Sequence, residues 1–277
     1  MGRTAILTYL TLVLILAAGG CRQTDAPEGT AEIAVTNSYL ESAVRDLWGG
    51  DVEILSLAPA GACPGHFDIS PGQVRQLQSC TLLLLFEFQQ QVRDRLTRLE
   101  EDGLGVRLVR TEPGLCLPET YLDTCREVAG LLASEYPDRA ATFERRLAAV
   151  QERVDRLADK LQETVAKSEA EAAQILVSNH QARFAEWLGL EPVATFVGSD
   201  LETVAHIDHC LRQAAGEDVR FIVANLQEGT GLAKALADRL GAEAVVFSNF
   251  PPAVDGVPGF DRLVRDNVQA LVEAATR

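Results

Sequence analysis

The sequence predicts an α/β protein of two lobes, each with a parallel sheet of about four strands flanked by helices, joined by one long backbone helix. Short apolar runs alternate with helical patterns on both sides of residues 137–168, which favours parallel sheets. That central stretch keeps one apolar face over its whole length. The run Thr81–Phe86 (TLLLLF) is continuously apolar, as in a strand that is buried on both faces.

The central stretch, Pro137–Ser168, has the spacing of an amphipathic helix, because its apolar residues recur in steps of three and four. Pro137 suits a first helical turn, and Asp138 favours the positive end of the helix dipole. At ~1.5 Å per residue the helix would be roughly 45 Å long, enough to pack across both lobes. A coiled-coil segment is the alternative, because the stripe also fits heptads. The stripe consists of Phe143, Leu147, Val150, Val154, Leu157, Leu161 and Val165.

The N-terminus has the pattern of an export signal. Arg3 precedes an apolar segment, Ala5–Ala18, which is short for a transmembrane span and right for a secretory signal. The small residues that end at Cys21 resemble a lipobox, which implies cleavage and lipidation of that cysteine. We therefore expect a signal peptide at 1–20 and a lipidated polar tether at 21–30, so that only the lipid contacts the membrane. An ordinary signal peptide followed by an unrelated cysteine is the alternative.

The first lobe, expected over residues 31–136, alternates apolar strands with longer helical segments, and its first helix ends at Gly49-Gly50. The expected strands are Glu32–Thr36, Val52–Leu57, Thr81–Phe86 and Val106–Val109, and the expected helices are Ser38–Trp48, Pro71–Gln78, Glu87–Leu99 and Glu119–Ser134.

The second lobe, expected over residues 169–277, repeats this scheme, with Asp200 as the cap of one helix. In open parallel sheets ligands bind outside the carboxyl ends of the strands, so we expect a ligand crevice between the two sheets. The expected strands are Gln174–Ser178, Pro192–Phe196, Arg220–Ala224 and Ala244–Phe247, and the expected helices are Gln181–Leu188, Leu201–Ala215, Leu232–Leu240 and Phe260–Ala274.

Composition excludes some classes of protein. The formal net charge is −15, which disfavours nucleic acid as a partner and tolerates a cation. Five of the six cysteines follow Cys21, and their odd number means that at least one stays free or binds a ligand.

Histidines are the main candidates for chemistry. His66 and His180 each follow an expected strand, one in each lobe, so they form a plausible metal pair. Two exposed loop histidines are the alternative. His206 and His209 lie three residues apart on one helix, but no further ligand is evident nearby, and we interpret them as part of a solvated face.

Two motifs resemble the zinc and manganese solute-binding lipoproteins of ABC transporters. Ser56–Pro71 (SLAPAGACPGHFDISP) is similar to the first metal-ligand loop of that family, with His66 at the position of its first metal-binding histidine. Leu176–His180 (LVSNH) is similar to the strand that ends in the third ligand. The resemblance implies two α/β lobes joined by a rigid helix and a bound transition metal, Zn²⁺ with Mn²⁺ as an alternative. It also implies a monomer in the periplasm or at the cell surface that serves an ABC permease.

The chain departs from the family pattern at two ligand positions. Gly114 stands where the family has a second histidine, and Asn249 stands where it has an acid. Two histidines alone would hold zinc weakly, because tight sites use three or four protein ligands. A thiolate, a side-chain oxygen or a changed ligand would fill the gap, and a disulfide between Cys63 and Cys116 is a further outcome. The completing candidates are Cys63 and Cys116 as thiolates and Asn249, Gln227 and Glu228 as oxygen donors.

These observations predict a binding protein and no enzyme. We expect it to capture a transition-metal ion between the lobes and deliver it to a membrane permease. A degenerate family member that binds a non-metal solute or a partner is the first alternative. A lipid-anchored metallohydrolase using His66 and His180 is the second, and it is disfavoured because the chain has no H-E-x-x-H or G-x-S-x-G motif.

Overall fold

The computed structural model describes residues 32–50, 52–62, 68–198 and 203–277. The expected signal peptide and tether, with Cys21, lie outside the described residues. So do Cys63 and His66 on the loop after the second strand, and Asp200. Among the described residues, no helix combines the length and apolar character needed to cross a membrane.

The first lobe contains a fully parallel sheet in the strand order β2-β1-β3-β4. Strand β3 occupies a central position and is buried along its whole length, as the apolar run predicts. Asn37 is the N-cap of helix α2, and its side-chain oxygen accepts from the backbone N–H groups of Tyr39 and Leu40. The strands are β1 (Ile33–Val35), β2 (Ile54–Ser56), β3 (Leu82–Phe86) and β4 (Gly105–Val109), and the main helices are α2 (Ser38–Trp48), α3 (Pro71–Leu77) and α6 (Pro118–Glu135).

The second lobe repeats this arrangement with strand order β6-β5-β7-β8, again fully parallel. The prediction of two parallel four-stranded sheets is confirmed. The strands are β5 (Gln174–Ser178), β6 (Glu191–Phe196), β7 (Val219–Asn225) and β8 (Glu243–Phe247), and the helices are α8 (Asn179–Trp187), α9 (Val204–Gln213), α10 (Gly231–Leu240) and α11 (Phe260–Ala275).

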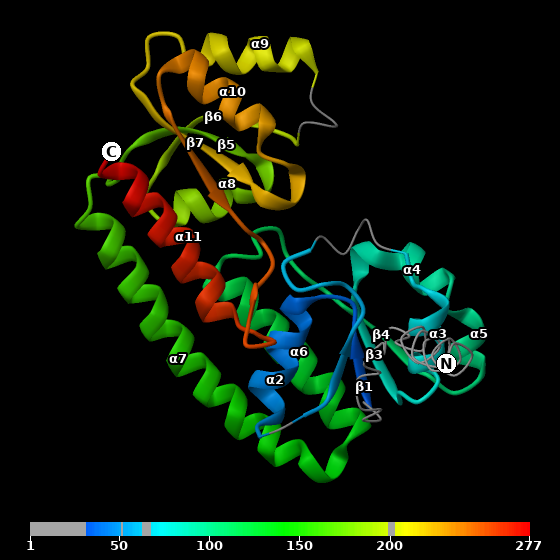
Figure 1. Ribbon diagram of the computed structural model, residues 1–277. Coiled ribbons are helices and arrows are strands. Elements are labelled where there is room, and N and C mark those ends of the chain that lie inside the picture. Colours follow the sequence, from blue (N-terminus) through cyan, green and yellow to red (C-terminus); the bar gives the residue numbers. More distant parts are fainter. Residues whose placement is uncertain (1–31, 51, 63–67, 199–202) are drawn as a thin grey trace, which may run out of the picture. The chain divides into compact units, whose positions relative to one another are not determined.

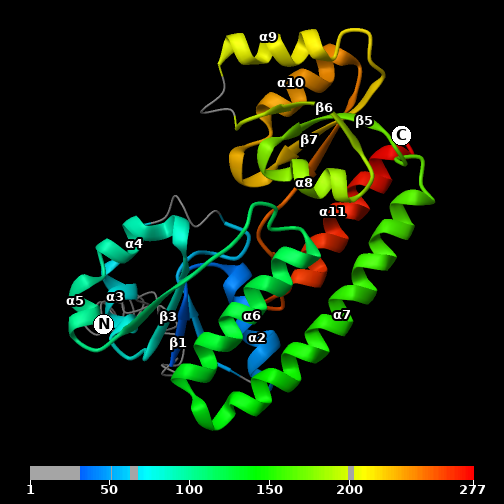
Figure 2. The same ribbon diagram turned by 180° about the vertical axis from the view of Figure 1, so that it is seen from behind.

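One long helix connects the two lobes. A 3₁₀ turn, η4 (Pro137–Arg139), leads into α7 (Ala140–Ala166), which contacts α2 and α6 of the first lobe and α11 of the second. Figure 1 shows α7 in green beside α6 and α11, and Figure 2 shows the same neighbours from behind. Six of the seven stripe residues are buried, and Leu147 is partly buried against the same core. The helix therefore packs within its own chain, and the coiled-coil interpretation is wrong.

Among the described residues, three apolar cores hold the layers together. The largest fills the inner faces of both sheets and includes the buried stripe of α7 together with α2, α6 and α11. Each of the two smaller cores covers the outer face of one sheet, in the first and in the second lobe. Because one core runs through both lobes, the apolar burial that stabilises one lobe also fixes the other.

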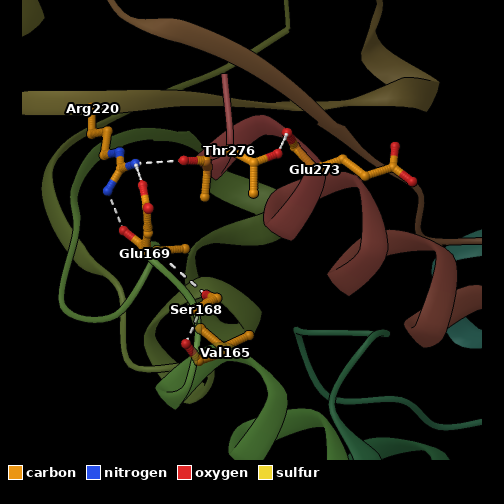
Figure 3. Close-up of polar contacts among 8 residues, drawn as sticks. Val165, Ser168, Glu169, Arg220, Glu273 and Thr276 are labelled. Atoms are coloured by element: carbon orange, nitrogen blue, oxygen red, sulfur yellow. Dashed lines mark hydrogen bonds and ion pairs between the residues drawn. The ribbon is translucent and has the colours of Figure 1, made fainter.

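Polar contacts brace α7 near its middle and beyond its C-terminal end. Asp46 on α2 accepts from the Tyr121 hydroxyl at 2.7 Å and also pairs with Arg153 of α7. Beyond the C-terminal end of α7, Arg220 pairs with Glu169 at 3.2 Å (Figure 3). Arg220 also donates to the Ala275 carbonyl of α11 at 2.6 Å. These contacts join segments of the chain that are distant in the sequence.

Three local features differ from or add to the expected structure. Residues 87–99 form no single helix but three short pieces, η3 (Glu87–Gln89), α4 (Gln90–Asp94) and α5 (Thr97–Glu101), and the breaks let Leu96 and Leu99 enter the outer core. Helix α9 is capped by Thr203, whose side chain accepts from the His206 N–H. A hairpin of β9 (Ala253–Val254) and β10 (Val257–Pro258) was not expected, although its Asp-Gly turn is a typical hairpin signal.

Candidate functional site

Loops at the carboxyl ends of the two sheets contact one another, at the place where the sequence predicts a ligand crevice. Gln227 follows β7, and its side-chain Nε2 donates at 2.8 Å to the carbonyl of Gly61, which lies in the loop after β2. Cys116 lies in the loop after β4, and its thiol donates at 3.0 Å to the carbonyl of Ser248, which follows β8. We call this region, formed by residues 58–62, 113–117, 178–183, 225–228 and 248–250, the interlobe junction.

His180 lies in the first turn of α8, directly after β5, and its side chain is 64% exposed. Its Nδ1 atom is 2.5 Å from Oε1 of Glu228. The hydrogen bond to Glu228 raises the pKa of His180, because the carboxylate stabilises the imidazolium; partial burial of the ring opposes this effect. The structure therefore brings together two of the candidate ligands, His180 and Glu228.

Glu228 lies behind the imidazole and is held on several sides. Its side chain is only 18% exposed, and Oε2 accepts from the Ser178 hydroxyl at 2.5 Å. Burial by itself would raise the pKa of this carboxyl, but hydrogen bonds from His180, Ser178 and Asn225 outweigh burial and lower the pKa. Glu228 is therefore an ionised, partly buried group at ordinary pH.

Asn249 is turned into the protein. It is buried, its Oδ1 accepts from Gln181 Nε2 at 3.0 Å, and the Cys116 Sγ lies 3.5 Å from the same oxygen. Its backbone N–H donates to Gln227 Oε1 at 3.0 Å, so the Gln227 oxygen is engaged as well. The side-chain oxygens of Asn249 and Gln227 thus bind groups of the protein itself.

Cys116 is a free thiol and is fully buried. Burial raises its pKa far above the ordinary range, while a hydrogen bond from Asn267 Nδ2 at 3.4 Å opposes this effect only in part. Of the outcomes that the sequence left open for Cys116, the structure shows a free thiol that donates to the Ser248 carbonyl. Cys116 therefore contributes a neutral thiol to the junction.

Gly114 has a backbone that disfavours the histidine of the family pattern. Its φ is +96°, in the region that favours glycine, and an added Cβ would lie 2.8 Å from Leu117 Cδ1. The Arg183 side chain of α8 packs beside it, with its Cβ 3.5 Å from that position. A side chain at residue 114 would thus require the loop to change shape.

His206 and His209 lie on α9, and their rings stack with centroids 6.2 Å apart. Within the described ranges, no group of three or more His, Cys, Asp or Glu side chains is arranged to hold a metal ion. His66 and Cys63, the candidates of the first lobe, lie outside those ranges.

Sequence reasoning did not identify several neighbours of the candidate site. Ser178 and Asn225 bind Glu228, and Gly198 packs against it. A signal was present for two of them, because Ser178 and Asn225 are the last residues of β5 and β7, where parallel strands place their functional groups. Gly198 gave no signal, because its role depends on a contact between residues 30 positions apart.

The two parallel sheets, the shared backbone helix and the junction at the strand ends define a two-lobed α/β solute-binding protein. The model of the family described as "Zinc-uptake complex component A periplasmic" (ZnuA) matches residues 116–274, more than half of the chain. The chain belongs to this family of zinc and manganese solute-binding proteins. Comparison with curated proteins gave no match.

Solved structures share the fold at low sequence identity. The Mn-bound periplasmic metal binding protein from Candidatus Liberibacter asiaticus is 14% identical, with a TM-score of 0.71, covering 88% of this chain and 98% of that one. The Cd-bound form of that protein is also 14% identical, with a TM-score of 0.72 and the same coverage of both chains. A crystal structure of ZnuA is 16% identical, with a TM-score of 0.70 and again 88% and 98% coverage. At these identities the likeness establishes the fold.

Proposed function

We propose that this protein captures a transition-metal ion, zinc in the first instance, at the interlobe junction and delivers it to an ABC permease. Membership of the zinc-uptake family supports this function. The observation that carries it is the position of His180, an exposed imidazole at the end of a central strand that is backed by an ionised carboxylate. The chemistry is capture and release of a cation, and no catalytic step is required.

The proposed ligands are His180 from the second lobe and His66 from the loop after β2. Zinc sites have four protein ligands, or three protein ligands and a water molecule. The two histidines therefore need at least one further ligand. Cys63, three residues before His66, is the thiolate candidate, and solvent is the alternative. Asn249, Gln227 and Cys116 are less suited, because their side-chain polar atoms are engaged within the protein. A Cys63 thiolate would favour zinc over manganese, because soft thiolates suit zinc and manganese prefers oxygen ligands.

The proposed organisation places the folded protein outside the cytoplasm, as a monomer. Residues 1–20 would be removed as a signal peptide, Cys21 would be lipidated, and residues 21–30 would form the tether. Residues 31–136 and 169–277 would be the two lobes, with the connecting helix over 137–168. Only the lipid would contact the membrane, and the permease would be the protein partner.

Zinc titration of the dialysed protein tests the function. We expect wild type to bind one equivalent, and His66→Ala and His180→Ala each to lose at least tenfold in affinity, because each removes one ligand of a small set. His209→Ala is the matched control, since it removes an exposed histidine on α9, outside the junction. Equal affinity in all four proteins would overturn metal capture at this site.

Capture of a non-metal solute is the second candidate function. Gly114 and Asn249 favour it, because Gly114 has no side chain to bind a metal and the Asn249 side-chain oxygen is engaged within the protein. Wild type that contains no metal after purification and binds neither Zn²⁺ nor Mn²⁺ would support this alternative.

A further inference from the structure

Glu228 binds one specific nitrogen of His180. Its Oε1 lies 2.5 Å from His180 Nδ1, and its Oε2 accepts from Ser178 Oγ at 2.5 Å. The carboxylate is largely covered, whereas the imidazole is mostly exposed. The acid therefore lies on the protein side of the ring, and the ring lies on the solvent side.

This contact determines which ring nitrogen can take a metal ion. When the Nδ1–H group donates to Glu228, the Nε2 atom keeps its lone pair. Histidines that bind metals commonly donate their other N–H to a carboxylate, which fixes the tautomer, orients the ring and raises its basicity. His180 and Glu228 have the arrangement that this role requires.

We propose that Glu228 is a positioning residue, which holds His180 as its Nδ1–H tautomer and presents Nε2 to the metal ion. This inference rests on the proposed function and deepens it, because it moves Glu228 from the set of possible ligands to a role behind the ligand. The partners of both Glu228 oxygens support it, because Ser178 and His180 already engage them.

A second contact shows that the fold makes room for Glu228. A Cβ added at Gly198 would lie 2.6 Å from the Glu228 Cβ and 3.2 Å from its carbonyl oxygen. Only a residue without a side chain admits Glu228 at this position. Gly198→Ala would thus displace Glu228 while leaving every charge in place.

NMR of the metal-free protein tests the tautomer directly. Long-range ¹H–¹⁵N spectra of the histidine rings, assigned with His180→Ala, would be recorded above the pKa of His180. We expect the Nδ1–H tautomer in wild type. In Glu228→Ala we expect the Nε2–H tautomer, which free histidine prefers. Glu228→Gln should keep Nδ1–H in part, because its amide oxygen still accepts. Glu186→Gln is the control and should match wild type, because it changes an exposed acid on α8, the helix that carries His180.

Zinc titration of the same proteins tests the consequence. We expect affinity to fall by about 10–100-fold in Glu228→Ala, less in Glu228→Gln, and measurably in Gly198→Ala, with Glu186→Gln unchanged. In zinc-loaded wild type the Nδ1–H resonance should persist. Thermal unfolding of each variant establishes whether it is folded. If Glu228→Ala does not fold, Glu228→Gln provides the test.

The outcomes separate the two proposals. Zinc binding with the same tautomer in wild type and Glu228→Ala would overturn the positioning role and leave metal capture standing. Loss of the Nδ1–H resonance on zinc loading would also overturn it, because the metal would then occupy that nitrogen. The expected tautomer without zinc binding by wild type would overturn metal capture itself.

Discussion

The side-chain amide of Gln227 donates to the Gly61 carbonyl at 2.8 Å, joining the loop after β2 to the end of β7. The same amide donates to Ser248 Oγ at 2.9 Å and accepts from the Asn249 N–H at 3.0 Å. One side chain thus connects three backbone segments from both lobes. This connection makes Gln227 a structural part of the interlobe junction.

Gln227→Leu should loosen the loop after β2. The substitution leaves the Asn249 N–H and the Gly61 carbonyl without their partner, at a cost of about 1–3 kcal/mol in unfolding free energy. Amide hydrogen exchange at Ala62, whose N–H bonds to the Pro59 carbonyl, should accelerate. Gln213→Leu, on the exposed face of α9, is the control. An unchanged exchange rate at Ala62 would contradict the role of Gln227 in holding the loop after β2.

Leu157→Ala should destabilise both lobes together. Leu157 is 2% exposed in the core that both lobes share. Removal of a buried leucine side chain costs about 2–5 kcal/mol through lost burial and the cavity left behind. Urea unfolding should remain a single transition with a lower midpoint, and Lys160→Ala, on an exposed face of α7, should change little. Two separate transitions would show that the lobes do not unfold as one unit.

The His180–Glu228 pair should give the metal-free protein a window of extra stability. The folded pKa of His180 is raised, so its contribution is complete below the unfolded value of about 6.5 and is lost as pH rises through the folded pKa. The pKa of Glu228 is lowered, so its contribution is present above about 4.3 and is lost as pH falls through the folded pKa. The largest stability difference between wild type and Glu228→Gln is therefore expected in mildly acidic solution. Urea unfolding in the presence of a chelator would measure it, and a difference that does not vary with pH would contradict the pairing.

Gly114→His should not restore the histidine of the family pattern. A non-glycine residue at positive φ costs about 1–3 kcal/mol, and the new Cβ would also meet Leu117. Gly189→His is a matched control, because residue 189 has a φ of +86° but open space around the added Cβ. Urea unfolding should show a larger loss at residue 114 than at 189, and zinc titration should show no gain in affinity. Tighter zinc binding by Gly114→His would contradict this view of the loop.

Cys21→Ser should release the protein from membranes, because the proposed anchor is the lipid on this cysteine. Fractionation of cells and mass spectrometry of the mature N-terminus would measure the change, with Thr24→Ser as the control. A mature wild-type N-terminus at another residue would contradict the assignment.

The sequence alone determined the architecture, because the architecture follows from periodic burial. In α7 the apolar residues recur in steps of three and four over its whole length, and β3 is an unbroken apolar run. These patterns indicate a helix and a central strand, and the structure has both. Local patterns were insufficient for residues 87–99, where burial of Leu96 and Leu99 outweighed a helical pattern and broke the segment into three. The Asp-Gly hairpin was readable from local turn chemistry and was overlooked.

Only the tertiary structure decided how the candidate side chains are used. His180 could be chosen from the sequence because it follows a strand, but its partner Glu228 is 48 residues away and depends on the order of β5 and β7 in the sheet. Asn249 has an amide oxygen suited in principle to a metal ion, yet contacts with Gln181 and Cys116 direct it inward. The physical reason is that a side chain's chemistry depends on which groups desolvate it and bond to it. Those groups come from segments that only the folded chain brings together.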